Sequence, residues 1–200
     1  MNWEHSGGGA KTIASSVISI LFLHSPLRRT LVAARLSPCM PPITALLHTR
    51  NDALRLGRAL ETLLPCAEIL IVDHDSSDAT HRIARQYGAR IVGAIRDAGA
   101  QNYLDLARND WIFCLDPRES LTESLQVSLF EWSALPPNSV GEASAYSVSR
   151  RYQIDDLWLD SSTPEVRLVP RNWNLWSGEF PAYANSAKLL KGELLFFAYP

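Results

Sequence analysis

Short apolar runs alternate with helical segments from Ile43 to about Trp132, and this alternation constrains the fold more than any other feature of the chain. The apolar runs are predicted to be buried strands, and they cover residues 43–47, 68–72, 89–92 and 111–115. Strands that alternate with helices at intervals of about twenty residues imply right-handed βαβ units. The sequence therefore predicts an α/β domain with a mostly parallel sheet flanked by helices.

The predicted helices carry start and stop signals. Asn51 or Asp52 is placed to cap the first helix, and its apolar face is formed by Leu56, Leu60, Leu63 and Leu64. Gly88 is placed to end a second helix over 79–87, and a third helix is predicted around 99–107. Ser120 and Glu123 form a capping-box pattern, and the apolar stripe of the helix that it predicts is Leu121, Leu125, Leu129 and Trp132.

Composition narrows the class of protein. The 200 residues are 46% hydrophobic and 20% charged, which is typical of one globular domain. A net charge of -2, without any basic run, predicts no binding to nucleic acid. The three cysteines are an odd number without CxxC spacing, which argues against a disulfide framework and favours a reducing compartment. We therefore expect a cytoplasmic protein.

The first forty residues differ from the rest. They contain four basic residues and one acidic residue, together with the Gly7-Gly8-Gly9 run. Their apolar part, 13–23, is interrupted by serines and is too short to span a bilayer, so we expect membrane contact to be peripheral at most. We expect 1–40 to be a poorly ordered N-terminal extension and 41–200 to be the folded domain. The alternative is that the natural protein starts at Met40.

Polar residues directly follow three of the predicted strands. The first strand runs into 48–52, the second into 73–78 and the fourth into 116–119. Ligands of open α/β sheets bind beyond the carboxyl ends of the strands. These three segments are therefore the candidate binding site. His48, His74 and His81 lie near it, but their spacing matches no metal motif, and we expect them in solvated positions.

The same segments carry a family resemblance. Residues 49–52 resemble the Lys-Asn-Glu segment of family 2 glycosyltransferases, and 72–80 resembles their V-D-x-x-S-x-D-x-T signature. Residues 108–116 are similar to the G-D-W-I-L-x-L-D stretch that leads into the family's D-x-D motif. Farther on, 166–171 and 176–178 resemble the R-L-F-R-R strand and the F-x-G that follows it. The order and spacing agree over most of 44–178.

The resemblance implies a GT-A-like, Rossmann-type sheet with a smaller irregular acceptor-side part at the C-terminal end. It implies transfer of a sugar, with inversion, from a nucleotide-diphosphate donor to a glycan or lipid-linked acceptor. The nucleotide-binding residues that it implies are Thr49, Asn51, Asp52, Asp73, Ser76, Gln101, Asn102 and Asp116. For Ser76 and Asp78, and for Asp73, the alternative is that the side chain caps the following helix.

The D-x-D motif is altered to Asp116-Pro117-Arg118, followed by Glu119. Mg²⁺ and Mn²⁺ prefer oxygen ligands, and Arg118 places a cation where the family has an anion. Three outcomes are open. Asp116 and Glu119 hold the divalent metal, or Arg118 itself neutralises the diphosphate, or catalysis is lost.

An inverting transfer needs a carboxylate as general base on the acceptor hydroxyl. The candidates are Asp155, Asp156, Asp160, Glu165 and Glu179, and we favour Asp155 and Asp156. Two alternatives to an active glycosyltransferase are kept. One is a catalytically impaired module of the same fold that binds nucleotide or glycan. The other is an unrelated flavodoxin-like domain, against which the 166–171 and 176–178 segments weigh.

Overall fold

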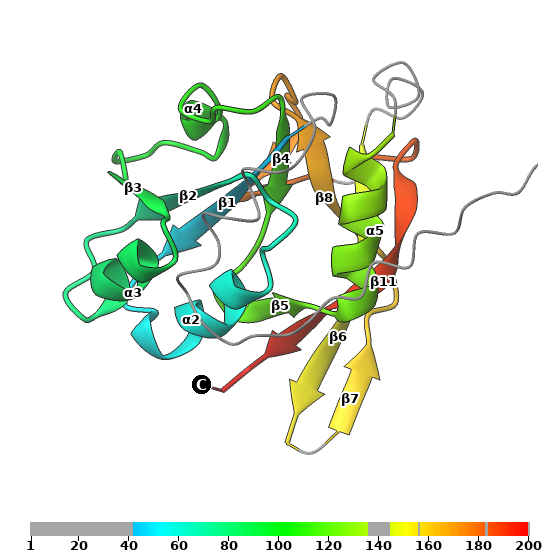
Figure 1. The fold of residues 1–200 in the computed structure, drawn as a ribbon, viewed down its shortest axis with the longest axis horizontal. Coiled ribbons are helices and arrows are strands. Elements are labelled where there is room, and N and C mark those ends of the chain that lie inside the picture. Colours follow the sequence, from blue (N-terminus) through cyan, green and yellow to red (C-terminus); the bar gives the residue numbers. More distant parts are fainter. Residues whose placement is uncertain (1–41, 136–144, 156, 183, 200) are drawn as a thin grey trace, which may run out of the picture.

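The computed structural model describes residues 42–135, 145–155, 157–182 and 184–199 (Figure 1). The predicted N-terminal extension, 1–40, lies outside these ranges and stays a prediction. Pro136-Pro137-Asn138, where the sequence interrupts the alternation of strands and helices, also lies outside these ranges.

One half of the large sheet is a parallel unit that matches the predicted alternation. Its order is β3-β2-β1-β4, and every neighbouring pair is parallel. The strands are β1 (Ile43–Thr49), β2 (Glu68–Asp73), β3 (Arg90–Gly93) and β4 (Trp111–Cys114). The connecting helices are α2 (Ala53–Glu61), α3 (Thr80–Gln86) and α4 (Gln101–Leu104). The carboxyl ends of β1, β2 and β4 therefore share one edge, as the sequence predicts.

The other half continues the same sheet in the order β4-β8-β6-β11-β5, with β7 paired to β6. Its strands are β5 (Glu119–Leu121), β6 (Tyr146–Ile154), β7 (Leu157–Asp160), β8 (Glu165–Pro170) and β11 (Lys188–Phe197). Strands β6 and β11 share the direction of β1, whereas β5, β7 and β8 run the opposite way. The predicted mostly parallel α/β sheet is confirmed.

A small hairpin lies beside this sheet. It consists of β9 (Trp176–Ser177) and β10 (Phe180–Pro181), which are antiparallel and are joined by Gly178 and Glu179. Gly178 has φ +63, a left-handed conformation that glycine adopts at little cost. Trp176 and Phe180 pack against the buried core. The hairpin is therefore anchored by apolar side chains on either side of its turn.

The helices differ from the prediction in three places. Helix α5 (Glu123–Ser133) is capped by Thr122, whose hydroxyl accepts a hydrogen bond from the Leu125 amide, so the predicted Ser120 capping box is wrong. Ser120 instead pairs with Leu195 between β5 and β11. Helix α4 is shorter than predicted, and α2 ends before Leu64, which is exposed.

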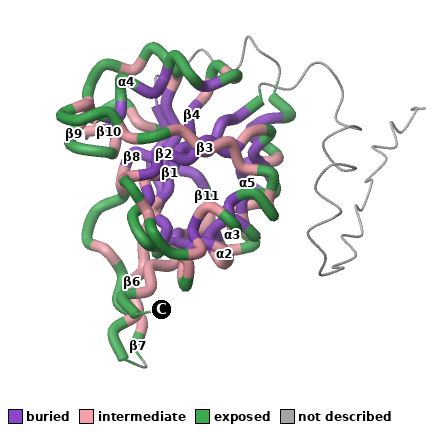
Figure 2. The backbone as a smooth tube through the Cα atoms, turned by 90° about the vertical axis from the view of Figure 1, so that its left-hand side faces the viewer, coloured by how far each residue is buried: buried purple, intermediate pink, exposed green. Residues whose placement is uncertain are grey.

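The core lies on both faces of the sheet, because side chains alternate along each strand. Helices α2, α3 and α5 cover one face, where Ile43, Ala45 and Leu47 of β1 are buried. Leu46 of the same strand packs on the other face, together with Tyr103 and Leu104 of α4. Figure 2 shows the buried residues gathered along the strands between these layers.

Strand β11 was not predicted, although it lies inside the sheet between β6 and β5. Its sequence, Lys-Leu-Leu-Lys-Gly-Glu-Leu-Leu-Phe-Phe, lacks the alternation that marks a half-buried strand. The pairing with β6 shifts register between Leu189 and Glu193. Gly192 lies in this shift with φ +91, and a Cβ there would stand 2.2 Å from the Leu125 backbone nitrogen. Glycine is required because the strand passes directly against the start of α5.

Candidate functional site

An open cavity of about 440 Å³ lies at the carboxyl ends of β1, β2 and β4. The loops after these three strands and the turn of the β9–β10 hairpin contribute to it. Its lining residues are His48, Thr49, Arg50, Asp52, Arg55, His74, Asp116, Pro117, Arg118 and Glu179. Four of the residues predicted for the site, Thr49, Asp52, Asp116 and Arg118, are therefore brought together.

Asn51 and Ser76 join the two loops beside the cavity but do not line it. The Asn51 amide donates to the Ser76 hydroxyl at 2.9 Å, and the Asn51 side-chain oxygen accepts the Ser77 amide at 2.8 Å. Asn51 has φ 57, a left-handed conformation that asparagine tolerates better than most residues. The hydrogen-bonding groups that we assigned to the nucleotide thus hold the β1–α2 loop against the β2–α3 loop.

Asp78 caps two helices, which confirms the capping alternative for this residue. One carboxylate oxygen accepts the Ala53 amide at the start of α2, at 3.0 Å. The other accepts the Thr80 amide at the start of α3, at 2.9 Å. Burial would raise the pKa of Asp78, but the hydrogen bonds from Thr80 and Ala53 outweigh it and lower the pKa. The ionised side chain therefore fixes both helix ends near the cavity.

Replacement of Asp78 by alanine is expected to lower the free energy of unfolding by about 1–2 kcal/mol, because it removes the cap of two helices at once. Urea unfolding followed by circular dichroism measures this change. Glu131→Ala, which removes an exposed acid from α5, is the control and should change stability by less than about 0.5 kcal/mol. Equal stability of the two variants would contradict the capping role.

Asp73 is nearly buried and acts as a local anchor. It accepts hydrogen bonds from the Thr49 hydroxyl at 3.3 Å and from the Ser76 amide at 3.0 Å, and His81 lies 2.8 Å away. Burial alone would raise its pKa, but the bonds from Ser76 and His81 lower it. Asp73 does not line the cavity, and the predicted contact of this carboxylate with base or ribose stays a prediction.

The two predicted contacts on α4 are not brought to the cavity either. Gln101 and Asn102 are exposed, and the Asn102 side-chain oxygen accepts the Gly99 amide at 3.1 Å, within its own turn. Helix α4 contributes through Tyr103 instead, whose buried ring meets the His48 ring edge-on with 5.5 Å between centroids. The predicted role of these two amides at the nucleotide stays a prediction.

The altered D-x-D segment forms a closed pair. Both carboxylate oxygens of Asp116 bind the Arg118 guanidinium, at 2.9 and 2.8 Å, and one of them also accepts the Arg118 amide. Burial would raise the pKa of Asp116, but Arg118 outweighs it and lowers the pKa. Arg118 also lies over the Phe196 ring, 4.8 Å from its centroid. Because a cation already occupies the carboxylate, Asp116 does not fit the divalent metal expected at this motif.

Glu119 is fully buried, which corrects its predicted role as a metal ligand. Its two oxygens accept hydrogen bonds from the Arg167 guanidinium at 3.0 and 2.9 Å, and one accepts the Asp116 amide at 3.0 Å. Arg150 lies 2.9 Å from it on another side. Glu119 faces the sheet interior because it begins β5, so it is a structural anion rather than a site residue.

The favoured general bases, Asp155 and Asp156, stay a prediction. Asp155 follows β6 with φ 53 and lines a separate cavity of about 270 Å³ with Arg58 and Tyr199. Asp156 lies outside the described residues. In the described part of the chain, Glu179 is the member of the predicted set of five acids that lines the main cavity. Burial raises its pKa, as do Asp116 and Asp52, while His74 opposes the shift.

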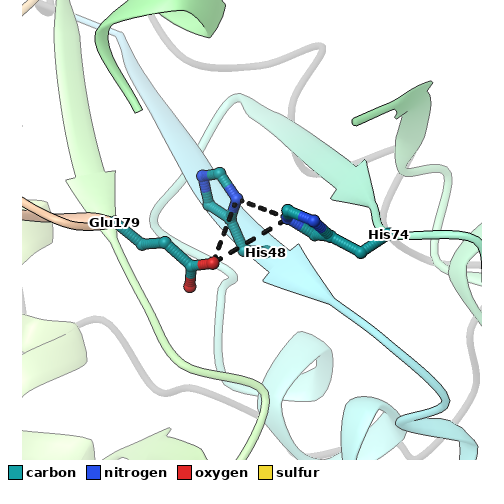
Figure 3. A group of neighbouring side chains, drawn as sticks. All are labelled: His48, His74 and Glu179. Atoms are coloured by element: carbon teal, nitrogen blue, oxygen red, sulfur yellow. Dashed lines mark hydrogen bonds and ion pairs between the residues drawn. The ribbon is translucent and has the colours of Figure 1, made fainter. Parts of the chain in front are cut away.

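Glu179 meets two histidines in the cavity, and the sequence did not predict this cluster. His48 Nδ1 lies 3.0 Å from His74 Nε2, and Glu179 Oε1 lies 3.6 Å from the first and 3.8 Å from the second (Figure 3). Burial, aided by His74, lowers the pKa of His48 to about 4. The parallel register that pairs His48 with Val72 brings the two rings side by side. The sequence signal that indicates this cluster is the position of the two histidines, since His48 lies near the end of β1 and His74 directly follows the neighbouring strand β2.

Comparison with known proteins adds to this geometry. No family model matches the chain. An uncharacterized glycosyltransferase of Rickettsia felis is 34% identical over 91 residues, which are 44% of this chain and 32% of that protein. The lipopolysaccharide core biosynthesis glycosyltransferase LpsC of Rhizobium meliloti is 31% identical over 118 residues, 55% of this chain and 42% of that protein. In sequence, the chain resembles curated glycosyltransferases.

The glycosyltransferase-like chain also has neighbours among solved structures. Mannosyl-3-phosphoglycerate synthase from Rubrobacter xylanophilus matches with a TM-score of 0.42 and 21% identity, over 64% of this chain and 43% of that chain. The chain spans about a third of the Rickettsia relative and less than half of LpsC. In the described ranges of the glycosyltransferase-like chain, no helix has both the length and the apolar character that a membrane crossing takes.

Proposed function

We propose that this chain forms the donor-binding domain of a glycosyltransferase. It takes a nucleotide-diphosphate sugar and passes the sugar to a hydroxyl of a glycan or lipid-linked acceptor. The observation that carries the proposal is the cavity at the carboxyl ends of β1, β2 and β4, where Arg50, Arg55 and Arg118 lie together. The family resemblance of the same strand ends supports it. We propose a cytoplasmic location with at most peripheral membrane contact, in keeping with the cysteine pattern.

Arg118 is proposed to take the place of a metal at the diphosphate. Its side chain is 46% exposed toward the cavity, while Asp116 and Phe196 hold the guanidinium in a fixed orientation. A guanidinium binds phosphate oxygens through two parallel hydrogen bonds, which a point charge does not. Arg50 on the β1–α2 loop and Arg55 in the first turn of α2 add positive charge to the cavity. Positive charge therefore reaches the diphosphate without a divalent ion at Asp116.

Thr49 and Asp52 are proposed to contact the nucleoside, since both line the cavity at the end of β1. Asn51, Ser76 and Asp73 serve the same site indirectly, because their hydrogen bonds fix the two loops that form its wall. Part of the predicted nucleotide-binding set is thus proposed to face the ligand and part to position the loops, whereas Gln101 and Asn102 do neither.

Glu179 is proposed as the general base in place of Asp155 and Asp156. Its side chain is half exposed in the cavity, and its raised pKa brings it closer to neutral pH, where a base is most effective. The acceptor oxygen forms a bond to the sugar carbon, the bond from that carbon to the diphosphate breaks, and the proton passes to Glu179. The nucleoside diphosphate leaves with the bonding electrons. Attack opposite the leaving group inverts the sugar carbon.

A catalytically impaired binding module is the second candidate. The observation that favours it is the Asp116–Arg118 pair, which occupies both oxygens of the first motif carboxylate. Such a module would bind the nucleotide in the same cavity without transferring the sugar.

A titration separates the two candidates. Nucleoside diphosphates and their sugar conjugates are added with Mn²⁺ or with EDTA, while the thermal midpoint is recorded. If the chain transfers the sugar and Arg118 replaces the metal, nucleotide stabilises the folded chain in EDTA, by about 2.7 kcal/mol at a nucleotide concentration of 100 times Kd. Nucleoside diphosphate is then also released slowly from one donor. Nucleotide binding without release of nucleoside diphosphate from any donor supports the catalytically impaired binding module. Absence of binding by every nucleotide contradicts both, and binding that requires Mn²⁺ contradicts the role of Arg118.

A further inference from the structure

His48, His74 and Glu179 converge from three separate elements of the fold. His48 is on β1, His74 directly follows β2, and Glu179 is in the turn of the β9–β10 hairpin. Figure 3 shows the three side chains pointing toward one another. Each offers one metal-ligand atom, and these atoms all lie within 4.8 Å of one another. The cluster does not include the altered D-x-D segment.

The spacing of the three atoms fits a bound metal ion. The separations are 3.0 Å between the ring nitrogens and 3.6 and 3.8 Å from them to the Glu179 oxygen. The point equidistant from the three corners of such a triangle is about 2.0 Å from each, so an ion slightly out of the plane lies at the distance of about 2.0–2.2 Å at which zinc binds nitrogen and oxygen. No large movement of the backbone is therefore needed to close a site.

The donor set selects among cations. Two imidazoles and one carboxylate suit Zn²⁺, Co²⁺ and Ni²⁺, whereas Mg²⁺ prefers oxygen ligands alone. Arg50, Arg55 and Arg118 line the same cavity as Asp52 and Asp116, so the donor atoms rather than the charge of the lining favour the cation. We propose that His48, His74 and Glu179 bind one borderline divalent cation of the zinc class.

The site would keep an open position. Three protein ligands leave a fourth tetrahedral position, which catalytic zinc sites fill with water or with a ligand oxygen. Here the open side faces the cavity, because His74 and Glu179 are 37% and 50% exposed there whereas His48 is 6% exposed. His48 is thus the rigid ligand, and the other two are free to adjust around the ion.

Metal binding has a consequence that rests on the proposed function. A cation takes Glu179 as a ligand, so the same carboxylate cannot accept the proton of the acceptor hydroxyl. Zn²⁺ is therefore expected to lower sugar transfer in proportion to the occupancy of this site. Binding of the cation itself requires no nucleotide and is tested without one.

The test uses the full chain, free of any histidine tag and stripped of metal. Zn²⁺ and Co²⁺ are titrated by calorimetry, and the visible absorption of Co²⁺ reports whether it is four-coordinate. The expected result is one equivalent bound by either ion and no comparable heat with Mg²⁺. Glu179→Gln and His74→Ala should each weaken binding by about tenfold or more, since loss of even an outer-shell partner costs about 10–100-fold.

His81→Ala is the matched control, because it removes a neighbouring imidazole that lies beside Asp73 and outside the cluster. It should bind Zn²⁺ like the unaltered chain. Unfolding midpoints of all variants, measured in EDTA, separate loss of a ligand from loss of the fold. Absence of binding at micromolar Zn²⁺, or binding that folded Glu179→Gln and His74→Ala retain in full, would overturn the proposal. Either outcome leaves the nucleotide titration unaffected.

Discussion

Replacement of Arg167 by methionine is expected to lower the free energy of unfolding by about 3–5 kcal/mol, because the buried Glu119 loses the guanidinium that binds both its oxygens and keeps Arg150 as its remaining cation. Arg167 on β8 is 1% exposed and binds both oxygens of Glu119, which is 0% exposed. It also pairs with Glu165, and its side chain is shielded from solvent. Urea unfolding of the variant and of the unaltered chain measures the difference.

Two further variants define the cause. In Arg167→Met with Glu119→Leu the buried charge pair is removed altogether, so this double variant should be more stable than Arg167→Met alone. Arg171→Met removes a surface arginine, whose partner Asp110 is 85% exposed, and should cost less than about 1 kcal/mol. A double variant less stable than the single one would mean that Glu119 supports the fold without Arg167, through the Asp116 amide and Arg150.

The buried pair also positions the cavity. The Asp116 amide donates to Glu119 at 3.0 Å, and the Glu119 amide donates to the Asp116 carbonyl at 2.9 Å. The turn that carries Arg118 is therefore fixed at both ends by the residue that Arg167 holds. Glu119 was predicted as a metal ligand on its position in the motif. In the structure, the buried Glu119 holds the 116–118 turn in place through its hydrogen bonds with Asp116.

The parallel half of the fold could be predicted from the sequence because its strands are continuous apolar runs separated by amphipathic helices. Strand β1, for example, is buried along nearly its whole length. The antiparallel half could be predicted only in part. The sequence predicts strands over 145–152 and 166–169, which correspond to β6 and β8, but it does not predict β11, because the bulge at Gly192 breaks any period. Its place in the sheet depends on contact with α5, which no local pattern records.

The candidate site shows the same division. Thr49, Asp52 and Arg118 were predicted because a parallel sheet brings the carboxyl ends of its strands to one edge. Asn51 and Asp73 hydrogen-bond neighbouring loops, and spacing does not reveal whether a polar side chain meets a ligand or another loop. Glu179 could not be singled out from the other acids. Its place in the cavity depends on the β9–β10 hairpin, which is held by packing of Trp176 and Phe180 against the core.

Replacement of Arg118 by glutamine is expected to weaken binding of a nucleoside diphosphate by about 10- to 100-fold, because hydrogen bonds between charged groups contribute about 1.5–3 kcal/mol. The change also leaves Asp116 without the cation that binds both its oxygens, so a negative charge would face the diphosphate. Binding of the corresponding nucleoside, which lacks phosphates, should change little. Calorimetry with the nucleoside diphosphate that stabilises the chain most, and with its nucleoside, measures both effects.

Arg118→Lys and Arg171→Gln complete the comparison. Lysine keeps the positive charge but lacks the planar fork that binds two phosphate oxygens, so its affinity should lie between those of Arg118→Gln and the unaltered chain. Arg171 lies outside the cavity lining and pairs with Asp110, so its loss should leave nucleotide affinity unchanged. Equal weakening of nucleoside and nucleoside diphosphate by Arg118→Gln would show that the residue shapes the cavity wall rather than binding phosphate. If the site binds diphosphate without metal, Arg118→Gln must weaken binding of the nucleoside diphosphate and leave binding of the nucleoside nearly unchanged, because the charge at Arg118 then acts on the phosphates.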